Sequence, residues 1–381
     1  TWEQAARRAG LRFGVSNHAS HAWHWWQTAY GYDPEGPRRG ERYDAFRLRK
    51  EHGRGKWWEG LDPQELYTGA SFAPPDGIAS NQSMADWHDA HDGRWMEFAP
   101  VQNSGFAGKW LLRQKELVEK YRPDMVYLDD YGLPFGPAGI EALAHYYNQA
   151  VGWHGSADVV MTAKVLSPYQ RRGLVEDIER GFSDRLRDEP WQTCTCIGDW
   201  HYNRARFDSR SYVPAEQIIQ RLVDTVSKNG SLLLSIPMRG DGTIDSEEEN
   251  ILDGIEGWMR VNGDAAIHGS RPWRIFGEGP TSLAGGMMSE SAGSQFTARD
   301  IRFLTKDRAL YAAFLKWPGQ AAPISALGLR ALAGAKVERA TLLEGGGVPF
   351  QQRDDALVLT LPQARRGSYV PVVKLEGRGL V

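Results

Sequence analysis

Short apolar runs alternate with helical patterns over the first two thirds of the chain. Leu11–Ser16 and Asp124–Asp129 are apolar stretches that end in polar residues, which is typical of buried parallel strands that open onto loops. Ala107–Tyr121 and Pro214–Lys228 carry apolar residues at helical spacing. This alternation predicts an α/β domain built on a parallel sheet.

Further segments continue the alternation. We expect a helix near Ile140–Val151 and strands at Asp158–Val165, Trp191–Ile197 and Ser231–Ile236, the last being the most clearly buried. Ser246 and Glu249 have the spacing of a capping box, so they predict the start of a helix that ends at Asn262–Gly263.

The pattern changes after Trp273 to short alternating runs that are separated by turn residues. These runs are Arg299–Thr305, Ala309–Leu315, Val337–Leu343, Ala356–Leu361 and Ser368–Leu375. Their spacing is typical of an antiparallel sandwich. We therefore predict two domains, an α/β domain over residues 1–275 and a β-sandwich over residues 276–381.

Composition narrows the classes of function. The 381 residues include 45 Lys and Arg against 48 Asp and Glu, a net charge of −3, which predicts no binding to nucleic acid or to an anionic membrane. Cys194 and Cys196 would share one face of a strand, where they are poorly placed for a mutual disulfide, and two cysteines fall short of a zinc site. The 15 tryptophans could fill a core or stack on sugar rings.

Two groups of carboxylates are candidates for chemistry. Asp129 and Asp130 close a predicted strand, where an α/β barrel builds its active site, and Glu176 and Glu179 lie in a charged loop. Two carboxylates beside aromatic rings suit glycoside cleavage, in which one attacks the anomeric carbon and the other protonates the leaving oxygen. From the residues alone, Asp129 could equally be a structural group and the loop a solvated turn.

Several segments together resemble α-L-fucosidases of glycoside hydrolase family 29, of the bacterial type. Tyr121–Asp129 resembles the strand that bears the nucleophile, and Trp191–Asn203 is similar to the family's Trp-Glu-Thr strand with its Trp-Gly-Tyr continuation. Leu222–Ile244 is similar to the most recognisable block of the family, and Trp258–Gly263 and Gly269–Trp273 extend the likeness. The resemblance covers nearly the whole chain in order.

The resemblance implies a (β/α)8-like TIM barrel followed by an antiparallel β-sandwich. It implies a retaining exo-hydrolase that releases terminal α-L-fucose by double displacement, with Asp129 as the nucleophile and Glu179 as the acid/base, Glu176 being the second choice. Asp130 stands where the family usually has Gly, and Gln192 stands where Glu is common.

The resemblance also implies residues that line the sugar pocket. His18, Trp23 and Trp25 follow the first predicted strand, where the family places such groups. Trp191, Trp200 and Tyr202 are candidates for the pocket wall, and packing in a core or a loop is the alternative for every aromatic residue of this set.

One departure from the family concerns the start of the barrel. Family members begin with two further strands, the second of which ends in a His-His-Asp-Gly-Phe motif that this sequence lacks. An open remnant would expose unpaired strand edges, so we expect the first barrel strands to lie in a segment missing from this sequence or in another chain.

Two rival functions stay open. One is α-L-galactosidase or a related exo-glycosidase on the same frame, because an apolar pocket excludes a single hydroxyl poorly. The other is a non-catalytic carbohydrate-binding protein. The expected partner is a fucosylated oligosaccharide or glycoconjugate, with no metal or other cofactor. An oligomer is left open, and analogy favours a periplasmic or secreted location.

Overall fold

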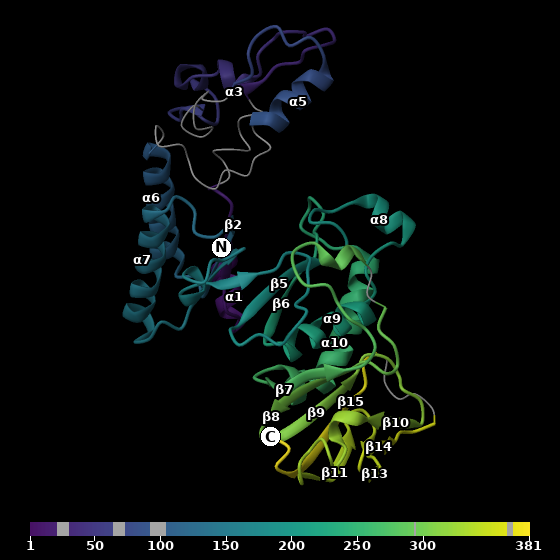
Figure 1. Ribbon diagram of the computed structural model, residues 1–381. Helices are drawn as coiled ribbons and strands as arrows, with labels where there is room; N and C mark the ends of the chain where they lie inside the picture. Colours follow the sequence, from purple (N-terminus) through teal and green to yellow (C-terminus); the bar gives the residue numbers. More distant parts are fainter. Residues whose placement is uncertain (21–29, 64–72, 92–103, 293–294, 364–368) are drawn as a thin grey trace. The chain divides into compact units, whose positions relative to one another are not determined.

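The computed structural model describes residues 1–20, 30–63, 73–91, 104–292, 295–363 and 369–381. The chain divides into two compact units, Thr1–Glu176 and Asp177–Val381 (Figure 1). The short strand β4 (Val175–Asp177) carries the chain from the first unit into the second. None of the helices in these ranges is long and apolar enough to cross a membrane.

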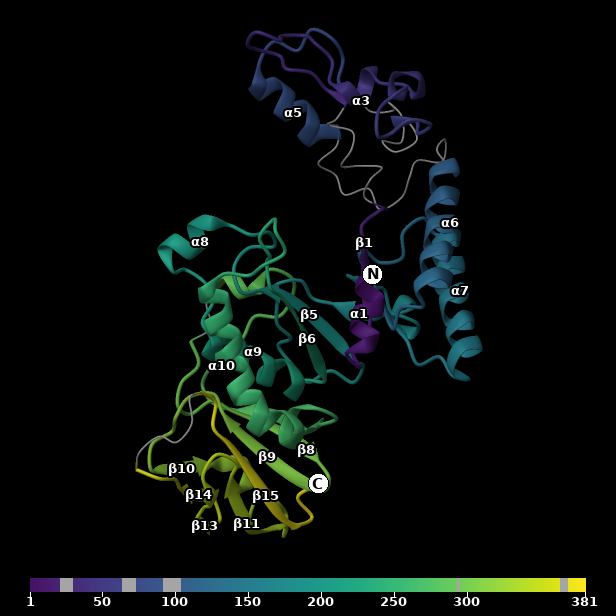
Figure 2. The same cartoon turned by 180° about the vertical axis from the view of Figure 1, so that it is seen from behind.

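Three parallel strands form the sheet of the first unit. β1 (Gly14–Asn17), which Figure 2 labels, pairs with β2 (Met125–Tyr131), and β2 pairs with β3 (Val160–Lys164). Most residues of β2 and β3 are buried, as expected for strands that pack on both faces. The predicted strands that end in polar residues are confirmed here.

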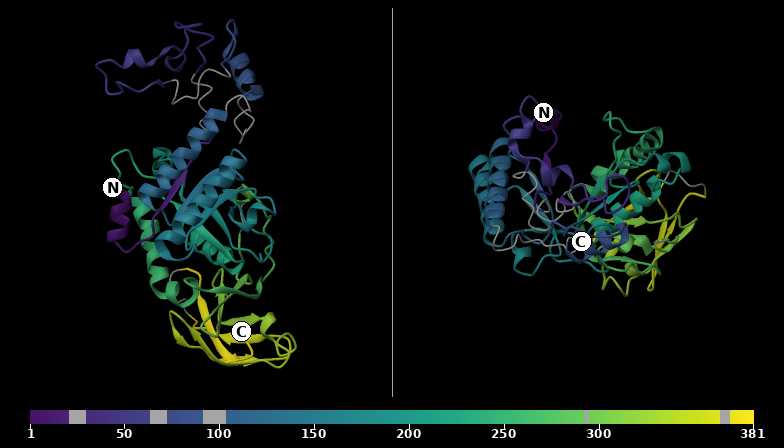
Figure 3. Two further views of the ribbon diagram at one scale, coloured as in Figure 1. Left: turned by 90° about the vertical axis from the view of Figure 1, so that its left-hand side faces the viewer. Right: turned by 90° about the horizontal axis from the view of Figure 1, so that it is seen from above.

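Two long helices, α6 (Ser104–Tyr121) and α7 (Pro137–His154), lie side by side in the first unit (Figure 3). Proline opens α7, where a missing N–H costs nothing, and Gly155 ends it in the left-handed conformation. Trp110 packs edge-on against Phe135 in the apolar core beneath. The unit also contains α1 (Trp2–Arg8), α3 (Asp44–Arg47), η2 (Lys50–Gly53), α5 (Asn81–His91) and η4 (Gln170–Arg172).

The second unit begins with a parallel pair and its helices. β5 (Trp191–Cys196) pairs with β6 (Gly230–Ser235), and α8 (Arg204–Ser209) and α9 (Ala215–Ser227) connect them. α10 (Ser246–Asn262) packs against α9 and continues into the π-helical turn η5 (Gly263–Ile267). This part confirms the predicted alternation of strand and helix.

Antiparallel sheets complete the second unit. One has the order β12-β11-β15-β9-β8-β7 and the other β10-β14-β13, with an apolar core between their strands. The elements are β7 (Arg271–Glu278), η6 (Ser289–Ala292), β8 (Ile301–Lys306), β9 (Ala309–Phe314), β10 (Ala321–Ile324), η7 (Ser325–Leu327), β11 (Lys336–Leu342), β12 (Gly346–Gly347), β13 (Phe350–Gln352), β14 (Leu357–Thr360) and β15 (Val372–Arg378). The change from parallel to antiparallel structure after Trp273 is confirmed.

Two expectations need correction. The capping box of α10 is formed by Asp245 and Glu248, one residue earlier than predicted, because the Asp245 carboxylate accepts from the N–H groups of Glu247 and Glu248. β6 is half exposed, because it is the last strand of its sheet, whereas all six residues of β5 are buried.

Candidate active site

Asp129 lies near the C-terminal end of β2, where the strand is irregular. The register with β3 runs evenly from Met125 to Tyr127, but the next paired residue of β2 is Tyr131, opposite Lys164. Two more residues of β2 than of β3 occupy this interval, so the segment that contains Asp129 bulges out of the regular ladder. Such irregularities often re-aim a side chain beside an active site.

The side chains of Lys164 and His18 hold the Asp129 carboxylate. The Lys164 ammonium donates to Oδ1, and the His18 ring nitrogen Nδ1 lies 3.1 Å from Oδ2. Lys164 is nearly buried at the end of β3, whereas the His18 ring is almost half exposed. The carboxylate is therefore oriented from inside the unit and reachable from the side of His18.

The neighbouring Asp130 points into the interior. Its Oδ1 accepts a hydrogen bond of 2.6 Å from the Ser20 hydroxyl, and its side chain is almost completely buried. This places Asp130 in a structural contact with the loop after β1. Trp23 and Trp25, which were predicted to line the pocket from that loop, lie outside the described residues.

Glu176 is engaged within the first unit. Its carboxylate accepts from the Arg171 guanidinium at 2.7 Å and from the backbone N–H of Leu166 at 3.1 Å. The two contacts tie η4 and the residue Leu166, which follows β3, to β4. This engagement favours a structural role for Glu176.

Glu179 lies in the second unit on a loop that is fixed through its backbone. The N–H of Met288 donates to the Glu179 carbonyl at 2.8 Å, and the N–H of Arg180 donates to the Cys194 carbonyl at the same distance. The Glu179 side chain is half buried. Arg180 has a φ of 43°, an unusual conformation for a residue other than glycine, which indicates a loop shaped by its surroundings.

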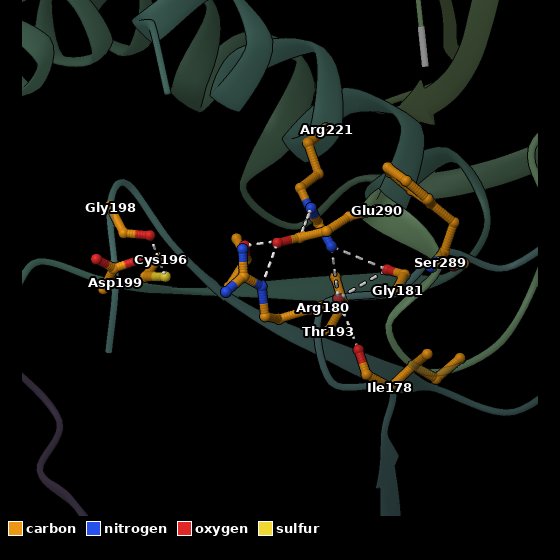
Figure 4. A network of polar contacts seen from close by, with 12 residues as sticks. Ile178, Arg180, Gly181, Thr193, Cys196, Gly198, Asp199, Arg221, Ser289 and Glu290 are labelled. Atoms are coloured by element: carbon orange, nitrogen blue, oxygen red, sulfur yellow. Dashed lines mark hydrogen bonds and ion pairs between the residues drawn. The ribbon is translucent and has the colours of Figure 1, made fainter. Parts of the chain in front are cut away.

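A network of charges includes Arg180, the residue that follows Glu179 in the chain (Figure 4). The Glu290 carboxylate accepts from the guanidinium groups of Arg180 and Arg221 and, at 2.8 Å, from the Thr195 hydroxyl. Burial lowers the pKa of Arg221 although Glu290 opposes the effect. For Arg180 burial is the largest single effect, but the hydrogen bond and charge of Glu290, together with the charges of Cys196 and Asp199, outweigh it and raise the pKa. All these groups line a cavity of about 340 Å³.

The three aromatic candidates of the second unit lie in different surroundings. Trp191 is 1% exposed and its indole N–H donates to the Lys228 carbonyl, which favours packing over contact with a sugar. Trp200 is 38% exposed, and the Arg180 guanidinium lies 5.9 Å from its ring centre. Tyr202 is half buried near the Arg239 guanidinium.

Sequence reasoning missed four charged residues of these two sites. Lys164 is the last residue of β3 and the next-to-last residue of the predicted strand Asp158–Val165, so a cation near a strand end was the available signal. Arg180 adjoins the predicted acid/base, but Arg221 lies on α9 and Glu290 on the short helix η6, where no motif marks them.

The comparisons with known proteins agree with one another. A family model described as Alpha-L-fucosidase matches residues 1–264. Tissue alpha-L-fucosidase of Rattus norvegicus is 27% identical over 262 residues, covering 67% of this chain and 51% of that protein. Plasma alpha-L-fucosidase of Homo sapiens is 29% identical over 211 residues, covering 53% of this chain and 40% of that protein. The chain spans about half the length, or less, of these curated relatives.

Solved structures share the fold. The alpha-fucosidase of Thermotoga maritima in complex with fucose gives a TM-score of 0.58 at 21% identity and covers 98% of this chain and 66% of that one. Alpha-L-fucosidase isoenzyme 1 from Paenibacillus thiaminolyticus gives 0.57 at 16% identity and covers 99% and 86%. Since the family model matches more than two thirds of its residues, this chain belongs to the α-L-fucosidase family.

Proposed function

We propose that this chain acts as a retaining exo-glycosidase that releases terminal α-L-fucose from fucosylated oligosaccharides or glycoconjugates. The observation that carries the proposal is the Asp129 carboxylate, which Lys164 and His18 hold near the end of a parallel strand in a chain of this family. The fucose complex of the Thermotoga maritima relative supports fucose as the sugar.

The proposed reaction has two displacements. An oxygen of Asp129 bonds to the anomeric carbon while the bond to the glycosidic oxygen breaks, and Glu179 gives its proton to the departing oxygen. Glu179 then takes a proton from water, whose oxygen bonds to the anomeric carbon as the ester bond to Asp129 breaks. Fucose leaves with its original anomeric configuration.

The contacts of Glu176 favour Glu179 over Glu176 as the acid/base. Glu176 accepts from a guanidinium and from a backbone N–H, and both of these bonds favour its ionised form over the protonated form that a general acid needs. His18 is the described residue best placed to contact the sugar, because its exposed ring adjoins the nucleophile. Trp200 is a second candidate for such a contact.

The first test is hydrolysis of an aryl α-L-fucoside. The wild-type chain should release fucose with retention, seen as the first anomer formed in an NMR time course. Asp129→Ala should lower turnover by about 10⁴-fold or more, because no ester forms without the nucleophile. Added azide should restore cleavage in this variant and give β-L-fucosyl azide, the inverted product.

A matched control is Asp158→Ala, which removes an exposed carboxylate that pairs with Arg12. This variant should keep wild-type activity. Equal activity of Asp129→Ala and wild type would refute the assignment of the nucleophile. Faster cleavage of the matching L-galactoside would favour the α-L-galactosidase alternative, and binding of fucosides without turnover would favour the carbohydrate-binding alternative.

The finer family expectations stay predictions. They are a bacterial-type member, parallel strands that form part of a (β/α)8 barrel, and first barrel strands that are missing from this sequence. The division into a catalytic domain over residues 1–275 and a sandwich over residues 276–381 is likewise part of the proposal.

A further inference from the structure

We propose that Glu290 is a positioning residue for Glu179, which it holds in place for proton transfer through Arg180 and the backbone of their shared loop. The inference rests on the proposed function, because it takes Glu179 as the general acid. It concerns the loop Ile178–Phe182 and the segment Gly286–Glu290, both in the second unit.

Backbone hydrogen bonds join the loop Ile178–Phe182 to the segment Gly286–Glu290. Met288 and Glu290 donate their N–H groups to the carbonyls of Glu179 and Arg180, at 2.8 and 3.0 Å. Gly286 donates to the Phe182 carbonyl, also at 3.0 Å, and Phe182 donates to the Ser289 hydroxyl. The peptide units on both sides of Glu179 and Arg180 are therefore fixed by residues more than a hundred positions further along the chain.

Close approach confirms how tightly the segments fit. A Cβ added to Gly181 would lie 2.0 Å from the carbonyl oxygen of Gly286 and 2.7 Å from the Ile178 side chain. Both distances are shorter than the contacts that Cβ atoms make in proteins, so only glycine allows this approach. The loop that carries Glu179 therefore takes its shape from the 286–290 segment.

Glu290 supplies the charge that keeps this arrangement together. Its carboxylate lies between two guanidinium groups, and Arg221 also donates to the Gly181 carbonyl at 3.1 Å. The side chains of Glu290 and Arg221 are 14% and 10% exposed, so water screens their charges weakly. Loss of the carboxylate would leave Arg180 and Arg221 facing each other and would free the loop.

A general acid is sensitive to such a displacement. Glu179 must lie within hydrogen-bond reach of the glycosidic oxygen as that oxygen departs. An error of about 1 Å in the position of a catalytic group can cost about 10²-fold in rate. The cost falls only on substrates whose leaving group needs a proton, which separates this role from a general loss of stability.

The decisive variant is Glu290→Gln, which keeps the shape of the side chain and removes its charge. We expect kcat/KM to fall by about 10²-fold for a fucoside with a weakly acidic leaving alcohol. It should change less than about 3-fold for 2,4-dinitrophenyl fucoside, whose leaving group departs without protonation. Glu256→Gln, the same change in the exposed pair with Arg260, is the matched control and should leave both values unchanged.

Chemical rescue supplies a second readout. Glu290→Ala opens space beside two guanidinium groups, and the adjoining cavity gives a small anion a route to them. Formate should raise the kcat/KM of Glu290→Ala for the fucoside with the weakly acidic leaving group by at least about 10-fold, because a carboxylate pairs well with guanidinium. The product should still be free fucose, because Glu179 is intact.

Three outcomes would overturn the inference. The first is an equal loss of kcat/KM with both leaving groups in a Glu290→Gln protein that unfolds at the wild-type temperature, and the second is wild-type activity in that variant. The third is formation of α-L-fucosyl azide by Glu290→Ala in azide, which would make Glu290 itself the acid/base. A wild-type chain inert toward all fucosides would instead refute the proposed function on which the inference rests.

Discussion

Lys164 brings a positive charge to the candidate nucleophile from the neighbouring strand. Its carbonyl also accepts from the N–H of Gly132 at 2.7 Å, so the end of β3 fixes both the Asp129 side chain and the turn that follows β2. A carboxylate held in this way is pre-oriented for attack, which lowers the entropy lost in reaching the transition state.

The Lys164→Met variant tests this orientation. We expect kcat/KM for an aryl fucoside to fall by about 10²-fold, because Asp129 loses the cation that aligns it. Lys115→Met, which removes a more exposed cation paired with Glu141, is the control and should retain full activity. Thermal unfolding of both variants checks that the fold persists, and undiminished activity of Lys164→Met would contradict the assignment.

At the scale of single residues, the sequence identified groups that end a strand and missed groups that meet across the fold. Asp129 closes an apolar run, so its place at a strand end was predictable. Glu290 meets Arg180 across 110 positions of the chain, and no local pattern reports such a contact. Trp191 is buried and Trp200 is exposed, although both lie in or near one strand. This difference also depends on contacts across the fold, so no local pattern predicted it.

At the scale of elements, the N-terminus of α10 shows how one side chain fixes a boundary. The Asp245 carboxylate accepts from the N–H groups of Glu247 and Glu248, and the N–H of Asp245 donates to the Glu248 carboxylate. The Tyr212 hydroxyl also donates to Asp245 at 2.7 Å, which ties the helix start to the loop before α9.

The Asp245→Ala variant should destabilise the protein by about 1 kcal/mol, the usual loss when an N-cap is removed, with an additional loss from Tyr212. Urea unfolding followed by circular dichroism measures this change. Asp253→Ala, at an exposed site within α10, is the control and should not lower the free energy of unfolding. Equal stability of the two variants would show that the cap contributes nothing.

Periodicity predicted most elements to within a few residues but not how they join. α9 spans Ala215–Ser227 and was predicted from its apolar face. The irregular register between β2 and β3 was not predictable, because it depends on how two strands 29 or more residues apart align. Competition between Ser246 and Asp245 for the cap of α10 was decided by the fold, since both residue types cap helices well.

At the scale of the whole molecule, buried carboxylates make stability depend on pH. Burial alone would raise the pKa of Asp300, but hydrogen bonds from Thr297 and Thr281 outweigh it and hold the pKa below its usual range. Asp245 has a lowered pKa for the same reason, with bonds from Glu248, Tyr212 and Glu247. In the unfolded chain these groups regain a pKa of about 3.9.

The sign of the effect follows from this difference. The stabilisation is complete above the unfolded pKa and is lost as the pH falls through the lower pKa of the folded state. The unfolding temperature should therefore drop steeply below about pH 4. Asp300→Asn should be less stable at neutral pH but should lose less on acidification, and a pH dependence as steep as that of wild type would contradict this account.

The class of fold was predictable, whereas its closure was not. Alternating helices and strands, followed by antiparallel strands, were evident because each pattern is local. Whether a parallel sheet closes into a barrel depends on pairing between strands far apart in sequence, which no local pattern reports.

The fit of Gly181 against Gly286 also bears on the order in which the loop of Glu179 takes its shape during synthesis. The ribosome makes the loop Ile178–Phe182 about a hundred residues before the segment that binds it. Until Gly286–Glu290 has emerged, Arg180 and Arg221 lack the Glu290 carboxylate, and Gly181 lacks the segment against which it packs. A nascent chain therefore carries the candidate nucleophile Asp129 long before Gly286–Glu290 can hold the loop of the proposed acid/base in place.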